Sequence, residues 1–128
     1  MHRKLAFVYF VILTAVAALN YIPGVRQPDG TVFGIFALDI FDDGLHLASA
    51  LWALTAALIS IRSARTFLIL FGAIYLCDGL LGLATGSGYL DLGIFTYGIQ
   101  DFPFSFKIKA NTPHIVLGGV ALAAGLKN

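Results

Sequence analysis

Hydrophobic residues dominate four long segments of the chain, and the polar residues gather between them. The apolar segments cover residues 5–21, 44–61, 66–84 and 112–126. A helix needs about 17–20 apolar residues to cross the hydrocarbon core of a bilayer. The first three segments reach that length, and the fourth reaches it when Ala110 and Asn111 join it or where the bilayer is thin. This pattern predicts four membrane-crossing helices in a single integral membrane domain, residues 1–128.

The connections after the first and third apolar segments are long and rich in aromatic residues. In the first, a helical spacing predicts a short helix at the membrane surface, with Phe33, Phe36, Ala37, Ile40 and Phe41 on one face. In the second, residues 102–109 alternate between apolar and polar, which is the period of a strand. An open strand cannot enter lipid, because its backbone groups would lack partners. We therefore expect both connections to lie at the lipid–water boundary and to cap the helices.

Composition and charge agree with a membrane protein. The chain is 59% hydrophobic and 12% charged, whereas soluble domains average about 25% charged residues. With four crossings, one side holds only basic residues, which are Arg3, Lys4, Arg62, Arg65 and Lys127. The positive-inside rule then places both termini in the cytoplasm. The basic residues and apolar run at the start of the chain also fit a signal peptide, but we expect this segment to remain as the first membrane helix. The net charge of +1 gives no sign of the basic surface that binds nucleic acid.

The second and fourth apolar segments open in the same way. Each begins with an Asx-x-x-His pattern. A basic residue also precedes the first and the third apolar segments, which come directly before these two. The corresponding residues are Asp43 and Asn111, His46 and His114, and Arg3 and Arg65. Tandem units with the same orientation form a parallel repeat. The sequence therefore predicts an all-α membrane protein, a four-transmembrane-helix bundle built from two tandem helical hairpins with long aromatic outer loops.

Several of these residues also carry a resemblance to a known family. They are His46, the Ala64-Arg65 pair, Gly72, Tyr75, Gly82, Asn111 and His114. With them the chain resembles, over nearly its whole length, a bacterial domain-of-unknown-function family of small four-helix integral membrane proteins. That family often has Asn where this chain has Asp43. The resemblance implies the four-helix architecture and brings no activity with it.

Polar residues inside the predicted membrane helices are the candidate site residues. His46 and His114 share helix faces with small residues, where membrane helices pack closely, so both should point toward other helices. Asp78 lies within the third segment, and an acid there costs about 2.5–3.5 kcal/mol on insertion scales, so it needs a partner or a wet cavity. The predicted polar cluster or ligand site comprises His46, His114, Asp78, Asp43, Asn111 and Tyr75. We expect the two histidines to approach each other across the bundle, close to Asp78.

Helix ends and glycines give further expectations. Asp43 should cap the second helix, and Thr112 and Pro113 should begin the fourth. Close helix packing is predicted at Gly72, Gly79, Gly82, Gly118 and Gly125. A leucine at Gly118 should cost about 1–3 kcal/mol by overpacking, whereas Gly88, in a loop, should tolerate substitution.

The sequence favours a non-enzymatic role. No nucleophile–base pair or phosphate-binding glycine loop is evident, and the single cysteine, Cys77, excludes Cys-x-x-Cys chemistry and should be a small buried residue. We expect an accessory or interaction subunit that contacts the lipid bilayer and forms a homo-oligomer or part of a larger membrane complex. The alternative is a haem-, metal- or quinone-binding module, with His46 and His114 as ligands of a haem iron or a transition metal.

Overall fold

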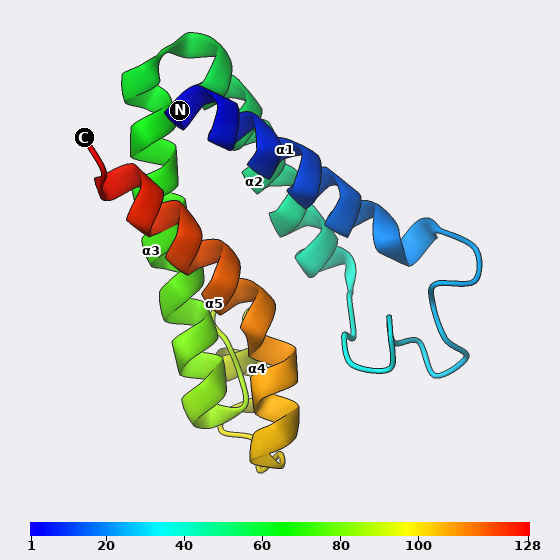
Figure 1. The fold of residues 1–128 in the computed structure, drawn as a ribbon. Helices are drawn as coiled ribbons and strands as arrows, with labels where there is room; N and C mark the ends of the chain where they lie inside the picture. The colour runs from blue at the N-terminus through cyan, green and yellow to red at the C-terminus, as the bar shows by residue number, and fades with distance from the viewer. The chain divides into compact units, whose positions relative to one another are not determined.

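A computed structural model describes residues 1–128 and is all-helical, as predicted. The elements in chain order are α1 (His2–Ala18), the 3₁₀ turn η1 (Leu19–Tyr21), α2 (Ile40–Ile59), α3 (Ile61–Thr85), α4 (Gly93–Tyr97) and α5 (Phe104–Leu126). The chain divides into two compact units, unit 1 (Met1–Ala64) and unit 2 (Arg65–Asn128). Each unit contains a pair of long helices that lie side by side (Figure 1).

Two helical stretches, His2–Tyr21 and Ile61–Thr85, are long and apolar enough to cross a membrane. Helices α2 and α5 are of similar length, with 20 and 23 residues. Both carry charged residues near their start, namely Asp42 and Asp43 in α2 and Lys107 and Lys109 in α5. These charged residues lower the mean hydropathy of helices whose later turns are apolar.

Unit 1 is a hairpin in which α1 packs along α2 (Figure 1). The buried face of α1 repeats every three or four residues and consists of His2, Ala6, Tyr9 and Leu13. The facing side of α2 offers small side chains, which are Ser49, Ala50, Ala53, Ala56 and Ala57. Small residues let two helix backbones approach closely, so the larger side chains of α1 fill the space left by α2.

An arginine joins the open end of this hairpin. The Arg3 guanidinium donates from Nε to the carbonyl of Ala57 at 2.6 Å and from Nη2 to the carbonyl of Leu58 at 3.3 Å. The last carbonyls of a helix have no donor within the helix. Arg3 therefore satisfies the end of α2 from the start of α1.

Helix α2 begins one turn earlier than predicted. Asp39 is its N-cap and accepts hydrogen bonds from the N–H groups of Phe41 (2.9 Å) and Asp42 (3.0 Å), while the Asp42 carboxylate accepts from the N–H of Asp39 (3.2 Å). This reciprocal pair is a capping box. The prediction that Asp43 caps the helix is wrong, because Asp39 takes that position and leaves Asp43 buried in the first turn.

The predicted surface helix around Phe33–Phe41 is also wrong. Residues 33–35 form a turn between the isolated bridges that Val32 makes to Arg26 and Phe36, and only Ile40 and Phe41 of this stretch are helical, as the first residues of α2. Gly30 and Gly34 adopt positive φ values of 87° and 70°, a conformation that breaks a right-handed helix. The aromatic spacing here reflects turns rather than a helical face.

Unit 2 is a second hairpin, in which α3 and α5 meet at glycines (Figure 1). A Cβ added at Gly72 would collide with the backbone of Leu122, and one added at Gly118 would collide with the backbone of Leu76. The other three predicted packing glycines also lie against the opposite helix: Gly79 against Ile115, Gly82 against Asn111, and Gly125 against Ile69. The two backbones are thus in direct contact along most of the hairpin.

Helix α5 starts at Phe104, so the strand predicted over residues 102–109 is wrong. Thr112 and Pro113 lie inside the helix rather than at its start. Proline has no N–H, so the carbonyl of Lys109 loses its helical donor there. The helix continues through this point because α3 supports it on both sides, through Gly82 at Asn111 and Gly79 at Ile115.

Cys77 differs from its prediction as well. It is exposed on α3, whereas a buried position was expected. The neighbouring residue Asp78 occupies the buried face of that turn. Which of these two side chains is buried depends on the face of α3 that it occupies and not on its polarity.

Candidate functional site

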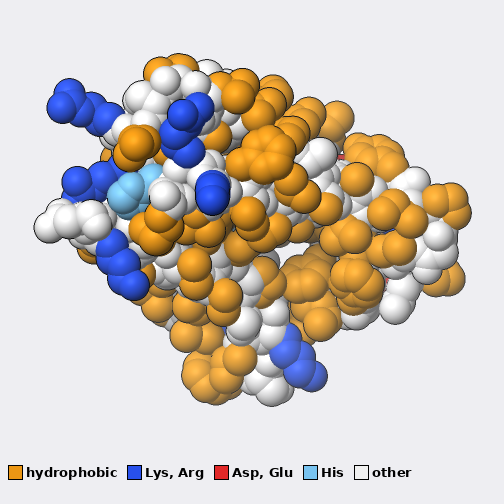
Figure 2. Space-filling model, turned by 45° about the horizontal axis from the view of Figure 1, so that its top comes forward, with side chains coloured by type: hydrophobic (Ala, Val, Ile, Leu, Met, Phe, Trp, Pro, Cys, Tyr) orange, Lys and Arg blue, Asp and Glu red, His pale blue; other side chains and the backbone are white.

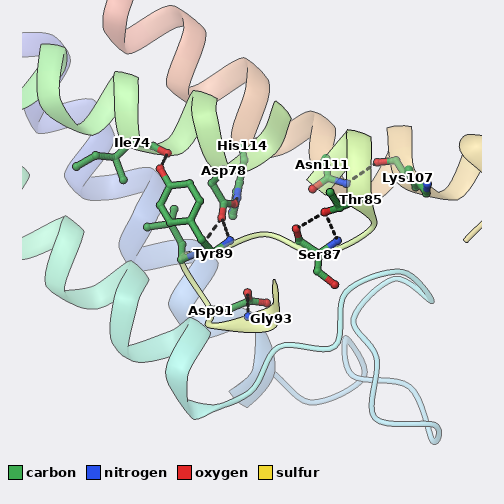
Figure 3. A network of polar contacts seen from close by, with 11 residues as sticks. Ile74, Asp78, Thr85, Ser87, Tyr89, Asp91, Gly93, Lys107, Asn111 and His114 are labelled. Atoms are coloured by element: carbon green, nitrogen blue, oxygen red, sulfur yellow. Dashed lines mark hydrogen bonds and ion pairs between the residues drawn. The ribbon is translucent and has the colours of Figure 1, made fainter. Parts of the chain in front are cut away.

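The polar centre of unit 2 is a contact between Asp78 of α3 and His114 of α5 (Figure 3). Nδ1 of His114 lies 2.5 Å from Oδ2 of Asp78. The Asp78 side chain is 4% exposed and that of His114 is 26% exposed. The acid within the apolar segment is therefore paired with a histidine from the facing helix.

The second oxygen of the same carboxylate holds the connection that follows α3 (Figure 3). Oδ1 of Asp78 accepts hydrogen bonds from the N–H groups of Tyr89 at 2.7 Å and Leu90 at 2.9 Å. Asp78 thus accepts three hydrogen bonds when His114 donates from Nδ1. A charged acceptor so fully satisfied is far less costly to bury than an unpaired one.

Gly88 lies directly over this carboxylate, and its predicted tolerance of substitution is wrong. A Cβ added at Gly88 would lie 2.5 Å from Oδ1 of Asp78. The chain must pass this close because the next two N–H groups bind the same oxygen. The loop position is therefore fixed by a buried contact that the local sequence does not reveal.

Aromatic rings continue the site along α3. Tyr75 meets the His114 ring edge-on, with centroids 5.1 Å apart and an interplanar angle of 64°. Tyr75 in turn stacks on Phe71 at 4.0 Å, and Phe71 stacks on Phe67 at 5.1 Å. His114 is held between a carboxylate and the end of a buried aromatic column, so its orientation is fixed on both sides.

The hydroxyl of Tyr89 closes the loop onto α3. It donates to the carbonyl of Ile74 (Figure 3). Burial, and then the negative charge of Asp78, raise the pKa of Tyr89 above its ordinary value. Tyr89 therefore remains a neutral donor through the physiological range.

Further hydrogen bonds secure the turn after α3. Thr85 Oγ1 lies 2.8 Å from the carbonyl of Leu81 and 2.9 Å from that of Ser87. The N–H of Gln100 donates to the carbonyl of Thr85 at 2.7 Å. The loop that covers Asp78 is thus tied at both of its ends.

This arrangement has a defined chemical capacity. A carboxylate on Nδ1 of a histidine fixes the ring orientation and the tautomer. Such an imidazole suits proton exchange or ligation of a metal or haem iron. No group of three or more His, Cys, Asp and Glu side chains is placed to hold a metal ion.

The remaining predicted site residues fall into both units. In unit 2, Asn111 lies against Gly82 and donates from Nδ2 to the carbonyl of Lys107 at 2.8 Å (Figure 3). In unit 1, Asp43 and His46 are both buried on α2. The structure therefore brings Asp78, His114 and Tyr75 together, and the approach of His46 to His114 stays a prediction.

Sequence reasoning missed Asn20, which contacts Asp43 in unit 1. Its Nδ2 donates to the carbonyl of Leu38 and lies 3.4 Å from Oδ2 of Asp43. The only signal in the sequence was an amide at the end of an apolar segment. The backbone donors of Tyr89 and Leu90 were missed too, because every residue type carries an N–H except proline.

Comparison with known proteins gives no match. No protein-family model matches this chain, no curated protein matches it, and no solved structure matches it. The functional argument therefore depends on the residues and contacts of the chain itself.

Proposed function

We propose that this chain is a small multi-pass protein of the bacterial inner membrane, in which two tandem hairpins give four membrane-crossing helices. In this proposal it is an accessory or interaction subunit rather than an enzyme. Both termini lie in the cytoplasm, and the connections between α1 and α2 and between α3 and α5 lie outside. The family resemblance of the sequence belongs to the same proposal.

The apolar exterior of the long helices is the observation that carries the proposal. Large hydrophobic side chains are exposed on each of them: Phe7, Val8 and Val11 on α1, Leu47, Leu51 and Leu58 on α2, Leu70, Ile74 and Leu80 on α3, and Val116 and Val120 on α5. Hydrophobic side chains also cover most of the face seen in Figure 2. Soluble monomers rarely expose contiguous apolar patches larger than a few hundred Å². Lipid, or a partner within lipid, is the surrounding that suits these faces.

Equivalent contacts in the two units support the tandem arrangement. Arg65 donates from Nε to the carbonyl of Gly125 at 2.8 Å, as Arg3 does to Ala57. The arginines are 62 residues apart (65 − 3) and the acceptors 68 apart (125 − 57), which is the offset of His46 and His114 (114 − 46). Buried positions follow the same offsets: Ala6 and Leu68, Tyr9 and Phe71, Leu13 and Tyr75, Ala50 and Gly118, and Ala53 and Ala121. Two hairpins of one origin and one orientation account for this correspondence.

The two arginines should make similar contributions to stability. Arg3→Gln and Arg65→Gln each remove a guanidinium that satisfies carbonyls at the end of the second helix of a unit. Hydrogen bonds to charged groups contribute about 1.5–3 kcal/mol, so we expect a loss in that range for each variant in thermal unfolding in detergent. Arg62→Gln, at an exposed position of α3, is the control and should change stability little. A loss confined to only one of the two arginine variants would argue against equivalent hairpins.

The arrangement of the polar site supports the accessory role. Asp78, His114 and Tyr89 hold a loop against a hairpin, which leaves the apolar exterior as the surface available for contacts with partners. Extraction in mild detergent followed by native mass measurement tests this role. We expect a particle that is larger than the 13.7 kDa chain and contains further protein. A protein that leaves its native membrane as a monomer in detergent would contradict the accessory role.

A haem- or quinone-binding module is the second candidate, favoured by one observation. The carboxylate of Asp78 orients His114 as it would orient an axial ligand or a proton-exchanging base. A visible-light spectrum of the protein purified from its native membrane decides about haem. A Soret band that is lost in His114→Gln would support haem, and a spectrum without visible bands would remove it.

A further inference from the structure

The first turn of α2 contains a carboxylate whose surroundings differ from those of Asp78. Asp43 is 7% exposed. Its Oδ2 lies 3.4 Å from Nδ2 of Asn20, and the hydroxyl of Tyr21 donates a hydrogen bond to the same carboxylate. Its Oδ1 is buried and accepts no hydrogen bond. A buried carboxylate oxygen without a donor is costly, so this position calls for a donor or a cation.

The amide of Asn20 adds a second acceptor beside it. Nδ2 of Asn20 faces the carbonyl of Leu38 and Oδ2 of Asp43. Reversing the amide would set its oxygen against two other oxygens, so the contacts fix its orientation. Oδ1 of Asn20 is therefore the acceptor, and it too is buried without a hydrogen-bond donor. Two side chains in contact thus present two unsatisfied oxygens and one negative charge.

His46 supplies an imidazole nitrogen, which can act as a metal ligand, to the same region. It follows Asp43 by three residues on α2 and is 6% exposed. Residues at this spacing are neighbours on a helix surface, and both side chains are buried in the hairpin that α2 forms with α1. Carboxylate oxygen, amide oxygen and imidazole nitrogen therefore lie at one end of unit 1.

We propose that Asn20, Asp43 and His46 form a binding site for one divalent transition-metal cation, with Zn²⁺ as the representative ion. Imidazole nitrogen together with carboxylate oxygen is a ligand set that zinc accepts. The site uses an amide as its third donor, so it does not require three His, Cys, Asp or Glu side chains. It is independent of the proposed accessory role and of the Asp78–His114 pair in unit 2.

The contrast between the two units explains why the site is in unit 1. In unit 2 the carboxylate of Asp78 is satisfied by His114 and by two backbone N–H groups. Arg3 and Arg65 are 62 residues apart, and the same offset makes Val16 the unit 1 equivalent of Asp78 (78 − 62 = 16). Unit 1 therefore carries its acid on the second helix, without the loop that satisfies Asp78.

Calorimetric titration with ZnCl₂ tests the proposal on the full chain in detergent after chelator treatment. A Cys77→Ser background removes the exposed thiol as a competing ligand. We expect one bound Zn²⁺ per chain. Asp43→Asn should weaken binding at least about tenfold, since loss of even a supporting group around a metal costs 10–100-fold. Asn20→Ala removes the amide oxygen and should also weaken binding at least about tenfold.

Two control variants complete the test. Asp101→Asn changes an exposed carboxylate, and His114→Gln changes the corresponding histidine of unit 2; neither should alter Zn²⁺ affinity. Asn20→Ala keeps the test decisive even where Asp43→Asn folds poorly, because it leaves the carboxylate of Asp43 in place. Absence of Zn²⁺ binding, or affinity that is the same in wild type, Asp43→Asn and Asn20→Ala, would overturn the proposal. Loss of binding in His114→Gln alone would place the metal in unit 2 and overturn it as well.

Discussion

Replacing Gly118 with alanine is expected to lower the stability of unit 2, whereas the same change at Gly119 is expected to leave it unchanged or raise it slightly. A Cβ at Gly118 collides with the backbone of Leu76, and backbone cannot rotate away as a side chain can. The helices must then separate, which costs about 1–3 kcal/mol by overpacking. At Gly119 nothing lies within 4 Å of an added Cβ, and alanine is better than glycine in a helix by about 0.5–1 kcal/mol.

Thermal unfolding of the two variants in the same detergent compares them directly. The pair is closely matched, because the residues are neighbours on α5 and undergo the same chemical change. Equal stability of Gly118→Ala and Gly119→Ala would show that α3 and α5 are not in backbone contact.

Replacing Asp78 with leucine should have the other large effect. The substitution removes the acceptor of the Tyr89 and Leu90 N–H groups and of His114. Each buried donor left without an acceptor costs about 1–3 kcal/mol, so we expect a loss of about 3 kcal/mol in thermal unfolding. Asp78→Asn keeps one oxygen for the loop and should cost less.

Hydrogen exchange locates this effect. The amides of Tyr89 and Leu90 should exchange much faster in Asp78→Leu and little faster in Asp78→Asn, with Asp101→Asn as the exposed control. Replacing a buried polar group with a hydrophobic one can also stabilise a protein. Unchanged or higher stability of Asp78→Leu would therefore mean that burying the carboxylate costs more than its hydrogen bonds return.

Hydrophobic patterning was sufficient for the helical class, because apolar runs near membrane-spanning length leave few alternatives. Helix ends were less predictable, since they depend on which polar side chain reaches the first free N–H groups. Asp39, Asp42 and Asp43 were all available at the start of α2, and the capping box selected Asp39. At Pro113 the sequence rule for a helix start was overridden by tertiary packing against Gly79 and Gly82.

The candidate site was predictable only where a polar residue type stands out within an apolar segment. Asp78 and His114 are conspicuous in apolar segments, and so they were chosen from the sequence. Their direct contact depends on the register of α3 against α5, which the glycines set but the sequence does not state. The loop over Asp78 contributes backbone N–H groups, and such donors leave no mark in a sequence.

Cysteine accessibility in intact cells tests the central claim, a four-crossing protein with both termini inside, most directly. In a Cys77→Ser background, single cysteines would replace Gln27 or Asp101 in the two long connections, Ile61 at the start of α3, or Asn128 at the C-terminus. The account predicts that a membrane-impermeant maleimide labels positions 27 and 101 in intact cells, and labels 61 and 128 only after the membrane is opened. Labelling of position 61 or 128 in intact cells would contradict it.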